Sequence, residues 1–183
     1  MAKVKQVIQE TEAVFGYVKG TVKWAKVLEV GQFGKYTVDV YGEAVEALVE
    51  QMEELRGEAA KEVDVAGKPY DVADVIKTDD EGKKFIQFGM KPENYKGDIQ
   101  SPTIYDKHGN EDAEWDKLVG NGSTIKVRYM AKPYYMNSTK MVGISYSFFA
   151  VQVIDLVEYS GGGESGFGDE TGDDTPFDTT EEF

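Results

Sequence analysis

The sequence contains no cysteine and a single histidine, His108. Without cysteine there are no disulfides, thiolate metal ligands or cysteine nucleophiles, and one histidine is too few for a His/Cys zinc site. His108 lies in the polar stretch DKHGNED, which is typical of a surface turn. We therefore expect no metal, no cofactor and no catalytic residue. The absence of cysteine also fits a reducing compartment.

Long apolar runs are absent as well. No segment approaches the roughly 18 apolar residues that a membrane span requires, and the N-terminal MAKVKQVIQE lacks the apolar centre of a signal peptide. The glycine-rich VGNGST lacks the lysine of a phosphate-binding loop. We expect a soluble cytoplasmic protein that does not contact membranes and is not an enzyme.

Positive charge is scarce overall, but the deficit is local. The net charge is -14, and eight of these excess negative charges lie after Tyr159, where there is no lysine or arginine. Residues 43–64 contain eight acids and two bases, which account for the remaining six. The rest of the chain is neutral, so a basic face is expected wherever its charges segregate.

Alternation of apolar and polar residues dominates the pattern and predicts strands. In the first of these segments, Val18, Val22 and Trp24 fall on the apolar side. The segment 91–117 mixes turn signals with short apolar patches and shows no clear period. Five segments are predicted to be strands: 16–30, 34–42, 83–90, 123–130 and 143–159.

One helix is predicted, at about residues 43–64. Its apolar residues recur every three or four positions and form one stripe, with the acids off the stripe. The stripe consists of Val45, Leu48, Met52, Leu55 and Ala59. Five strands and one inserted helix predict a mostly β fold, a partly closed five-stranded barrel of the OB type, within a domain of residues 1–159.

Lysine, arginine and aromatic residues are interleaved along these strands. This combination is typical of proteins that bind single-stranded nucleic acid, because cations contact the phosphates and flat rings stack on the bases. In AKPYYMNSTK (131–140), the two tyrosines have no obvious core to enter. We predict contacts through Tyr17, Lys19, Lys23, Trp24, Lys35, Lys83, Phe85, Lys126, Arg128, Lys132, Tyr134, Tyr135 and Lys140.

Residues 160–183 are rich in glycine, serine and acids, and have too little apolar surface to fold. We expect a flexible acidic tail. Its end, DDTPFDTTEEF, suits a partner with a basic-rimmed apolar pocket, and its acids are expected to compete with phosphates for the basic strands. The predicted partner-binding residues are Asp173, Asp174, Phe177, Asp178, Glu181, Glu182 and Phe183.

The tail and three stretches of the body resemble single-stranded DNA-binding proteins, most closely the phage type. The stretches are KGTVKWAKVLEVGQFGKYTVDVYG, LVGNGSTIKVRYMAKPY and FFAVQVIDLVEY. The resemblance implies a non-enzymatic protein that coats and protects single-stranded DNA during replication, recombination and repair. It also implies a tail that recruits polymerase, primase-helicase or recombination proteins, a capacity to form homodimers, and, for a phage protein, action in the host cytoplasm.

Two alternatives remain open. An acidic protein that mimics DNA and inhibits a host nucleic-acid-binding protein would use the acidic helix and tail, but would leave the strand lysines without a role. RNA binding by the same surface is also open, because proteins distinguish RNA from DNA through the 2′-hydroxyl.

Overall fold

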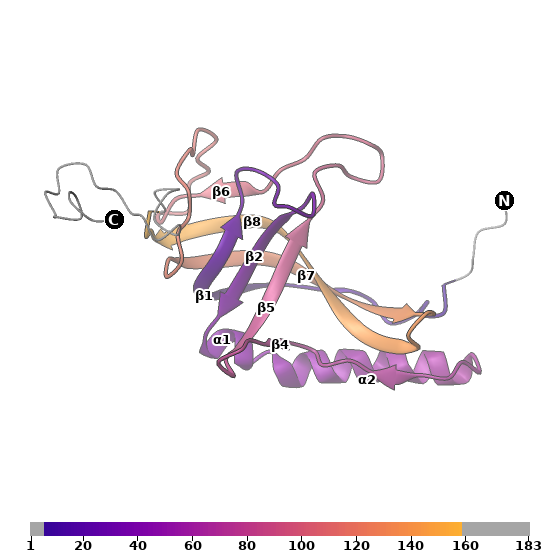
Figure 1. The fold of residues 1–183 in the computed structure, drawn as a ribbon. Coiled ribbons are helices and arrows are strands. Elements are labelled where there is room, and N and C mark those ends of the chain that lie inside the picture. Colours follow the sequence, from indigo (N-terminus) through magenta and orange to yellow (C-terminus); the bar gives the residue numbers. More distant parts are fainter. Residues whose placement is uncertain (1–5, 159–183) are drawn as a thin grey trace, which may run out of the picture.

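Five strands close into a barrel in the computed structural model, which describes residues 6–158 (Figure 1). The predicted tail therefore lies outside the described residues. The strand order around the barrel is β1-β2-β5-β8-β7 and back to β1, with every pair antiparallel except β5–β8. The prediction of a five-stranded barrel is confirmed. The strands are β1 (Val14–Lys26), β2 (Tyr36–Tyr41), β5 (Lys84–Met90), β7 (Thr124–Met136) and β8 (Met141–Asp155).

β1 pairs with two strands of the barrel in succession. Its first part pairs with β7 as far as Thr21, and its second part pairs with β2 from Thr21 onward. At the change of partner stands Gly20, where an added Cβ would lie 2.2 Å from the carbonyl oxygen of Tyr41. Only glycine lets the two backbones approach so closely.

Three short strands border the barrel. β3 (Asp71–Val72) and β6 (Thr103–Tyr105) pair with β8 in parallel, and β4 (Lys77–Thr78) pairs with β5. Together with the pairing of Gly89 to Ser147, β3 and β6 cover the edge of β8 that faces away from β7. β6 lies in the segment for which the sequence pattern predicted no element.

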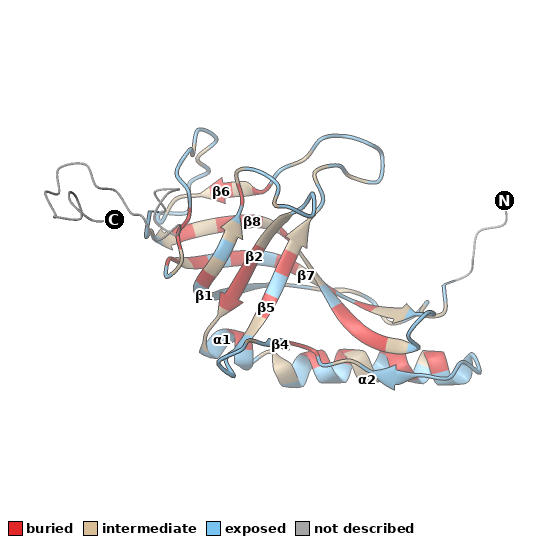
Figure 2. Ribbon diagram, in the orientation of Figure 1, coloured by how far each residue is buried: buried red, intermediate tan, exposed pale blue. Residues whose placement is uncertain are grey.

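The helical insertion follows β2, as predicted, and is divided into α1 (Glu43–Glu46) and α2 (Val49–Val65). α2 packs beneath the barrel and along the β7–β8 hairpin (Figure 1). Val45, Met52, Leu55 and Ala59 of the predicted stripe are buried, whereas the acids of α2 other than Glu62 are exposed (Figure 2). Within residues 6–158, no helix is both long and apolar enough to cross a membrane.

The core follows the predicted alternation except at Trp24. Val18 and Val22 of β1 are buried, but the Trp24 side chain is 55% exposed. A register shift between Lys23 and Lys26 interrupts the pairing with β2, and Trp24 has a positive φ of 55°. This irregularity turns the residue out of the apolar side, so its predicted place beside Val18 and Val22 is wrong.

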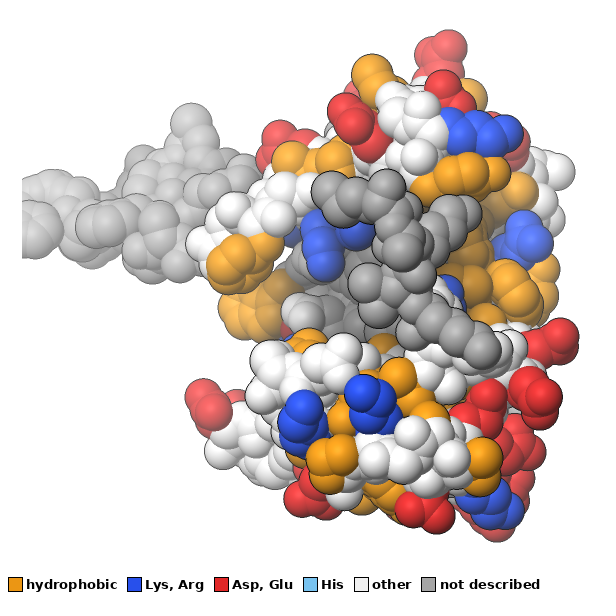
Figure 3. Space-filling view, turned by 90° about the vertical axis from the view of Figure 1, so that its right-hand side faces the viewer, with side chains coloured by type: hydrophobic (Ala, Val, Ile, Leu, Met, Phe, Trp, Pro, Cys, Tyr) orange, Lys and Arg blue, Asp and Glu red, His pale blue; other side chains and the backbone are white. Residues whose placement is uncertain are grey.

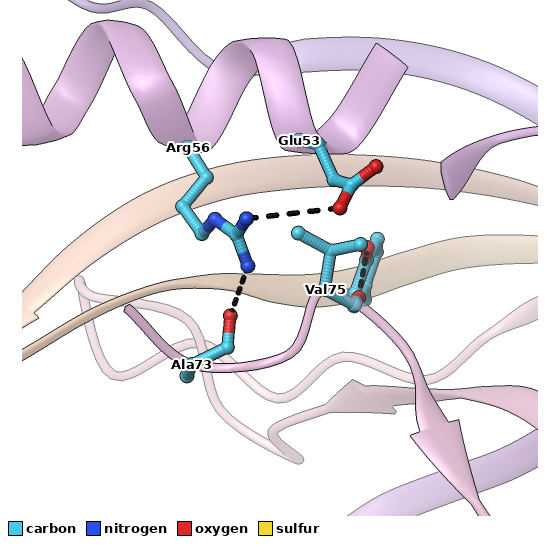
Figure 4. Close-up of polar contacts among 5 residues, drawn as sticks. Glu53, Arg56, Ala73 and Val75 are labelled. Atoms are coloured by element: carbon cyan, nitrogen blue, oxygen red, sulfur yellow. Dashed lines mark hydrogen bonds and ion pairs between the residues drawn. The ribbon is translucent and has the colours of Figure 1, made fainter. Parts of the chain in front are cut away.

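Arg56 joins α2 to the segment between β3 and β4 (Figure 4). Its side chain is 17% exposed, donates a hydrogen bond of 2.6 Å to the carbonyl oxygen of Ala73, and lies 3.8 Å from Glu53. Nearby, the Tyr146 hydroxyl donates to the carbonyl oxygen of Val75. These two contacts satisfy backbone acceptors that the short strands β3 and β4 leave unpaired.

An N-terminal arm, residues 6–13, precedes β1 and contacts the end of α2. Val7 and Ile8 pack against the small apolar cluster that contains Ala59 and Ala60. Partial burial raises the pKa of the Glu62 carboxyl, but hydrogen bonds from the Thr11 hydroxyl and from the arm backbone outweigh it and lower this pKa to about 2. The arm is therefore attached to an ionised carboxylate at neutral pH.

We expect Arg56→Met to lower the free energy of unfolding by about 1.5–3 kcal/mol, because it removes a charged hydrogen-bond donor and leaves a partly buried acceptor unpaired. Urea denaturation followed by circular dichroism measures the change. Lys61→Met, at an exposed position of the same helix, is the matched control. Equal stability of the two variants would contradict this role for Arg56.

Candidate nucleic-acid interface

Four of the predicted side chains meet on the outer side of β1 and β7, and we call them the basic strip. They are Tyr17, Lys19, Lys126 and Arg128. Tyr17 lies opposite Arg128 and Lys19 lies opposite Lys126 in the antiparallel pairing. The buried residues Ile125, Val127 and Tyr129 alternate with the cations of β7, so strand geometry itself directs those cations outward.

The lysines of the basic strip repel each other. Two lysines directly opposite each other on neighbouring strands destabilise the pair, and this is the arrangement of Lys19 and Lys126. Among residues 6–158 the ion pairs are Arg56–Glu53 and Lys83–Glu81, so within the described part of the chain no acid forms an ion pair with the cations of the strip. A polyanion bound here would relieve the repulsion.

A cavity of about 270 Å³ opens on the basic strip. Tyr17, Lys126 and Arg128 line one part, and Tyr105 and Gln152 line the other. Tyr17 is 64% exposed, and the Lys126 ammonium lies 5.3 Å from the centre of its ring. An exposed ring beside cations suits a base and its phosphate.

Sequence reasoning did not select Tyr105 and Gln152. β6 places Tyr105 opposite Gln152 of β8, but a three-residue strand is too short for its period to be read. Gln152 had a usable signal, since it stands between two valines in a predicted strand.

A second group of predicted residues lies on the outer side of β2 and β5. The Tyr41 and Phe85 rings stack with centres 5.0 Å apart, and the Lys23 ammonium lies 5.0 Å from the Tyr41 ring. Acids accompany them, because Asp39 pairs with Lys23 across the strands and Lys83 forms an ion pair with Glu81. Acids therefore lie among the cations of this face.

The acids of this face also affect the pKa of Tyr41. Burial and a hydrogen bond with Asp79 raise it to about 12, with further contributions from the charges of Asp39 and Glu81. Burial also raises the pKa of Asp39, against the lowering effects of Gln87 and Lys77. A carboxylate in the centre of this face opposes a phosphate backbone.

The third group lies on the β7–β8 hairpin. Lys132 and Tyr134 point to the same outer side as the basic strip, and the Tyr134 ring lies against Gly143, where an added Cβ would be 2.5 Å from its hydroxyl oxygen. Tyr135 points the other way, packs against the apolar cluster of α2, and donates a hydrogen bond to Pro69. Its position favours a packing role. Lys140 stands in the hairpin turn with a positive φ of 58°.

Lys35 and Trp24 belong to none of these groups. The backbone N–H of Trp24 donates to the side chain of Asn121, beside the turn that precedes β7. Lys35 lines a cavity of about 460 Å³ with the loop 91–101 and with Phe149. Figure 3 shows Lys or Arg side chains and hydrophobic side chains close to one another on one side of the molecule.

Within the described residues, no three His, Asp or Glu side chains gather in a way that suits a metal ion. The acids of the exposed loops instead accept backbone hydrogen bonds within their own turns, as Asp106 does from His108 and Asn110. These side chains shape turns.

The barrel belongs to the OB-like class, and solved structures share its particular form. No protein-family model and no curated protein sequence matches the chain. The fold matches gp2.5, a single-stranded DNA-binding protein encoded by bacteriophage T7, with a TM-score of 0.64 at 20% identity, over 88% of this chain and 98% of that one. It also matches the single-stranded DNA-binding protein of bacteriophage Enc34, with a TM-score of 0.53 at 11% identity, over 93% and 96%. The predicted likeness to phage single-stranded DNA-binding proteins is confirmed for the fold.

The two hairpin tyrosines are expected to respond differently to truncation. Tyr135→Ala should lower the free energy of unfolding by about 2–4 kcal/mol, because it opens a cavity beside α2 and removes a hydrogen bond. Tyr134→Ala should leave thermal unfolding nearly unchanged. Differential scanning calorimetry separates the two, and Tyr135→Phe isolates the hydroxyl. A large loss of stability in Tyr134→Ala would place its ring in the core.

Proposed function

We propose that this protein binds single-stranded DNA without regard to sequence and acts by coating it rather than by catalysis. The observation that carries the proposal is the basic strip, where Lys19 and Lys126 lie opposite each other, form no ion pair with an acid in the described part of the chain, and have an exposed tyrosine beside them. The fold shared with two phage single-stranded DNA-binding proteins supports it.

The strip is a better site than the outer side of β2 and β5. Phosphate contacts require cations whose charge is available, and on β2 and β5 Asp39, Asp79 and Glu81 lie among the lysines and rings. On the strip, Tyr17 and Tyr105 flank a cavity between cations, which allows a base to stack while its phosphate is neutralised.

The acidic tail supplies the regulatory part of the proposal. Its acids compete with phosphates for the basic strip, and Phe183 with the preceding acids is bound by replication proteins such as a polymerase, a primase-helicase or a recombination factor. The protein then works in replication, recombination and repair in the cytoplasm of a host cell. The solvent-facing acids of α2 favour one rival, an acidic protein that mimics DNA, which predicts no binding of DNA in any form of the chain.

The double variant Lys126→Ala/Arg128→Ala should bind oligo(dT) about tenfold or more weakly at low salt. It should also reduce the slope of log K against log salt concentration by about 1.4, because two phosphate contacts are lost from a single strand. Titrations followed by tryptophan fluorescence, and checked by gel shift, measure both quantities. Lys61→Ala/Lys68→Ala removes two exposed cations away from the strip and is the matched control. Equal slopes in the two double variants would rule out the strip as the site.

A chain that ends at Tyr159 should bind oligo(dT) more tightly than the full chain, and the difference should shrink as salt rises, because both attractions are electrostatic. The same titration at several salt concentrations tests this expectation. Identical affinities at low salt would exclude competition by the tail, and no binding by either chain would favour the DNA mimic.

A further inference from the structure

The N-terminal arm is held by one side chain. The backbone N–H groups of Gln9 and Glu10 donate to Oε1 of Glu62 at 2.8 and 2.7 Å, and that of Thr11 donates to Oε2 at 2.7 Å. The Thr11 hydroxyl also donates to Oε2. Three consecutive amides and a hydroxyl thus converge on a single carboxylate, and hydrogen bonds to an ionised group are about twice as strong as neutral ones.

Glu62 stands at a position that is unfavourable for the helix alone. It lies in the last turn of α2, where the helix dipole favours cations and disfavours a carboxylate, and this turn contains no basic residue. The acid therefore owes its favourable contacts to the arm and not to the helix.

The arm forms one wall of a groove of about 480 Å³. Gln6, Val7, Ile8 and Thr11 line the arm side. Opposite them the β7–β8 hairpin contributes a cation, two half-buried tyrosine rings, a proline and two polar side chains, namely Lys132, Tyr134, Tyr135, Pro133, Asn137 and Ser145. This is again the mixture of residues that single-stranded DNA requires.

The groove continues the basic strip. Arg128, Lys132 and Tyr134 all lie on the outer side of β7. Between Arg128 and Lys132 on this strand stands Met130, which lines the cavity beside the loop 91–101 together with Ser145 and Phe149. Phe149 stacks on Phe15 of β1 with ring centres 6.3 Å apart. From Lys126 to Tyr134 the strand spans about 27 Å, which suits the roughly 4–16 nucleotides that an OB domain occupies.

We propose that single-stranded DNA bound on the basic strip continues along β7 into the groove beneath the N-terminal arm, and that Glu62 is the positioning residue that holds the arm as the wall of this groove. Lys132 contacts a phosphate there, and Tyr134 stacks on a base. The inference rests on the proposed function, and adds to it a second segment of the binding path and a residue that controls it without touching DNA.

The test is Glu62→Ala in the full chain, with Glu58→Ala, at an exposed position on the same helix, as the matched control. Two probes are titrated, oligo(dT) of about 6 nucleotides, which fits the strip, and of about 16 nucleotides, which reaches the groove. Glu62→Ala should weaken binding of the longer probe about tenfold, the value of one lost stacked base, and change binding of the shorter probe less than about twofold. Glu62→Gln, which keeps one acceptor, should fall between Glu62→Ala and the unaltered chain.

Hydrogen exchange at the amides of Gln9, Glu10 and Thr11 verifies that the arm is released. A double-mutant cycle then separates positioning from general stabilisation. Lys132→Ala should weaken the longer probe in the unaltered chain, and have much less effect in the Glu62→Ala background.

Three outcomes would overturn the inference alone: equal weakening of both probes, additive effects of Glu62→Ala and Lys132→Ala, or tighter binding of the longer probe once the arm is released. The last result would make the arm a cover that excludes DNA. Failure of the unaltered chain to bind either probe would overturn the proposed function, and this inference with it.

Discussion

The barrel depends on the close approach of two backbones at Gly20, where β1 leaves β7 and joins β2. Any side chain at this position would collide with the carbonyl oxygen of Tyr41 and push β1 away from β2. The change of partner at this point also divides the outward-facing residues of β1 between two surfaces. Lys19 faces a lysine of β7, whereas Lys23 faces the carboxylate of Asp39 on β2. One backbone constraint thus produces both a basic face and a neutral one.

A net charge of -14 is compatible with a basic strip because charges act locally. At physiological ionic strength, electrostatic interactions between exposed groups are largely screened beyond about 8 Å. α2 lies beneath the barrel, and its acids other than Glu62 are exposed. The strip can therefore attract a phosphate at short range. The net negative charge of the chain weakens the long-range attraction of DNA more than it weakens direct contacts between DNA and the strip.

Alternation of residues was sufficient to predict the strands, the barrel and the helix, because each strand has one buried side and α2 has one buried stripe. It could not predict the exposure of Trp24, since a register shift changes the side of the strand on which a residue lies without changing the composition of the strand. It also missed the pairing of Tyr105 with Gln152, which comes from two segments far apart in the chain. Tyr134 and Tyr135 look equivalent in sequence, yet only the position of α2 determines which ring is packed. Local pattern thus located the cations of the proposed site, and long-range contacts determine which rings lie beside them.

β8 is 15 residues long, and such a strand with one free edge would be a template for pairing with other chains. Three short segments, β3, the end of β5 and β6, occupy parts of that edge. Under the proposed function, many copies would be crowded along one DNA strand at high local concentration. By occupying parts of this edge, the three segments would limit strand pairing between neighbouring copies, so that a crowded row of proteins on DNA could still separate.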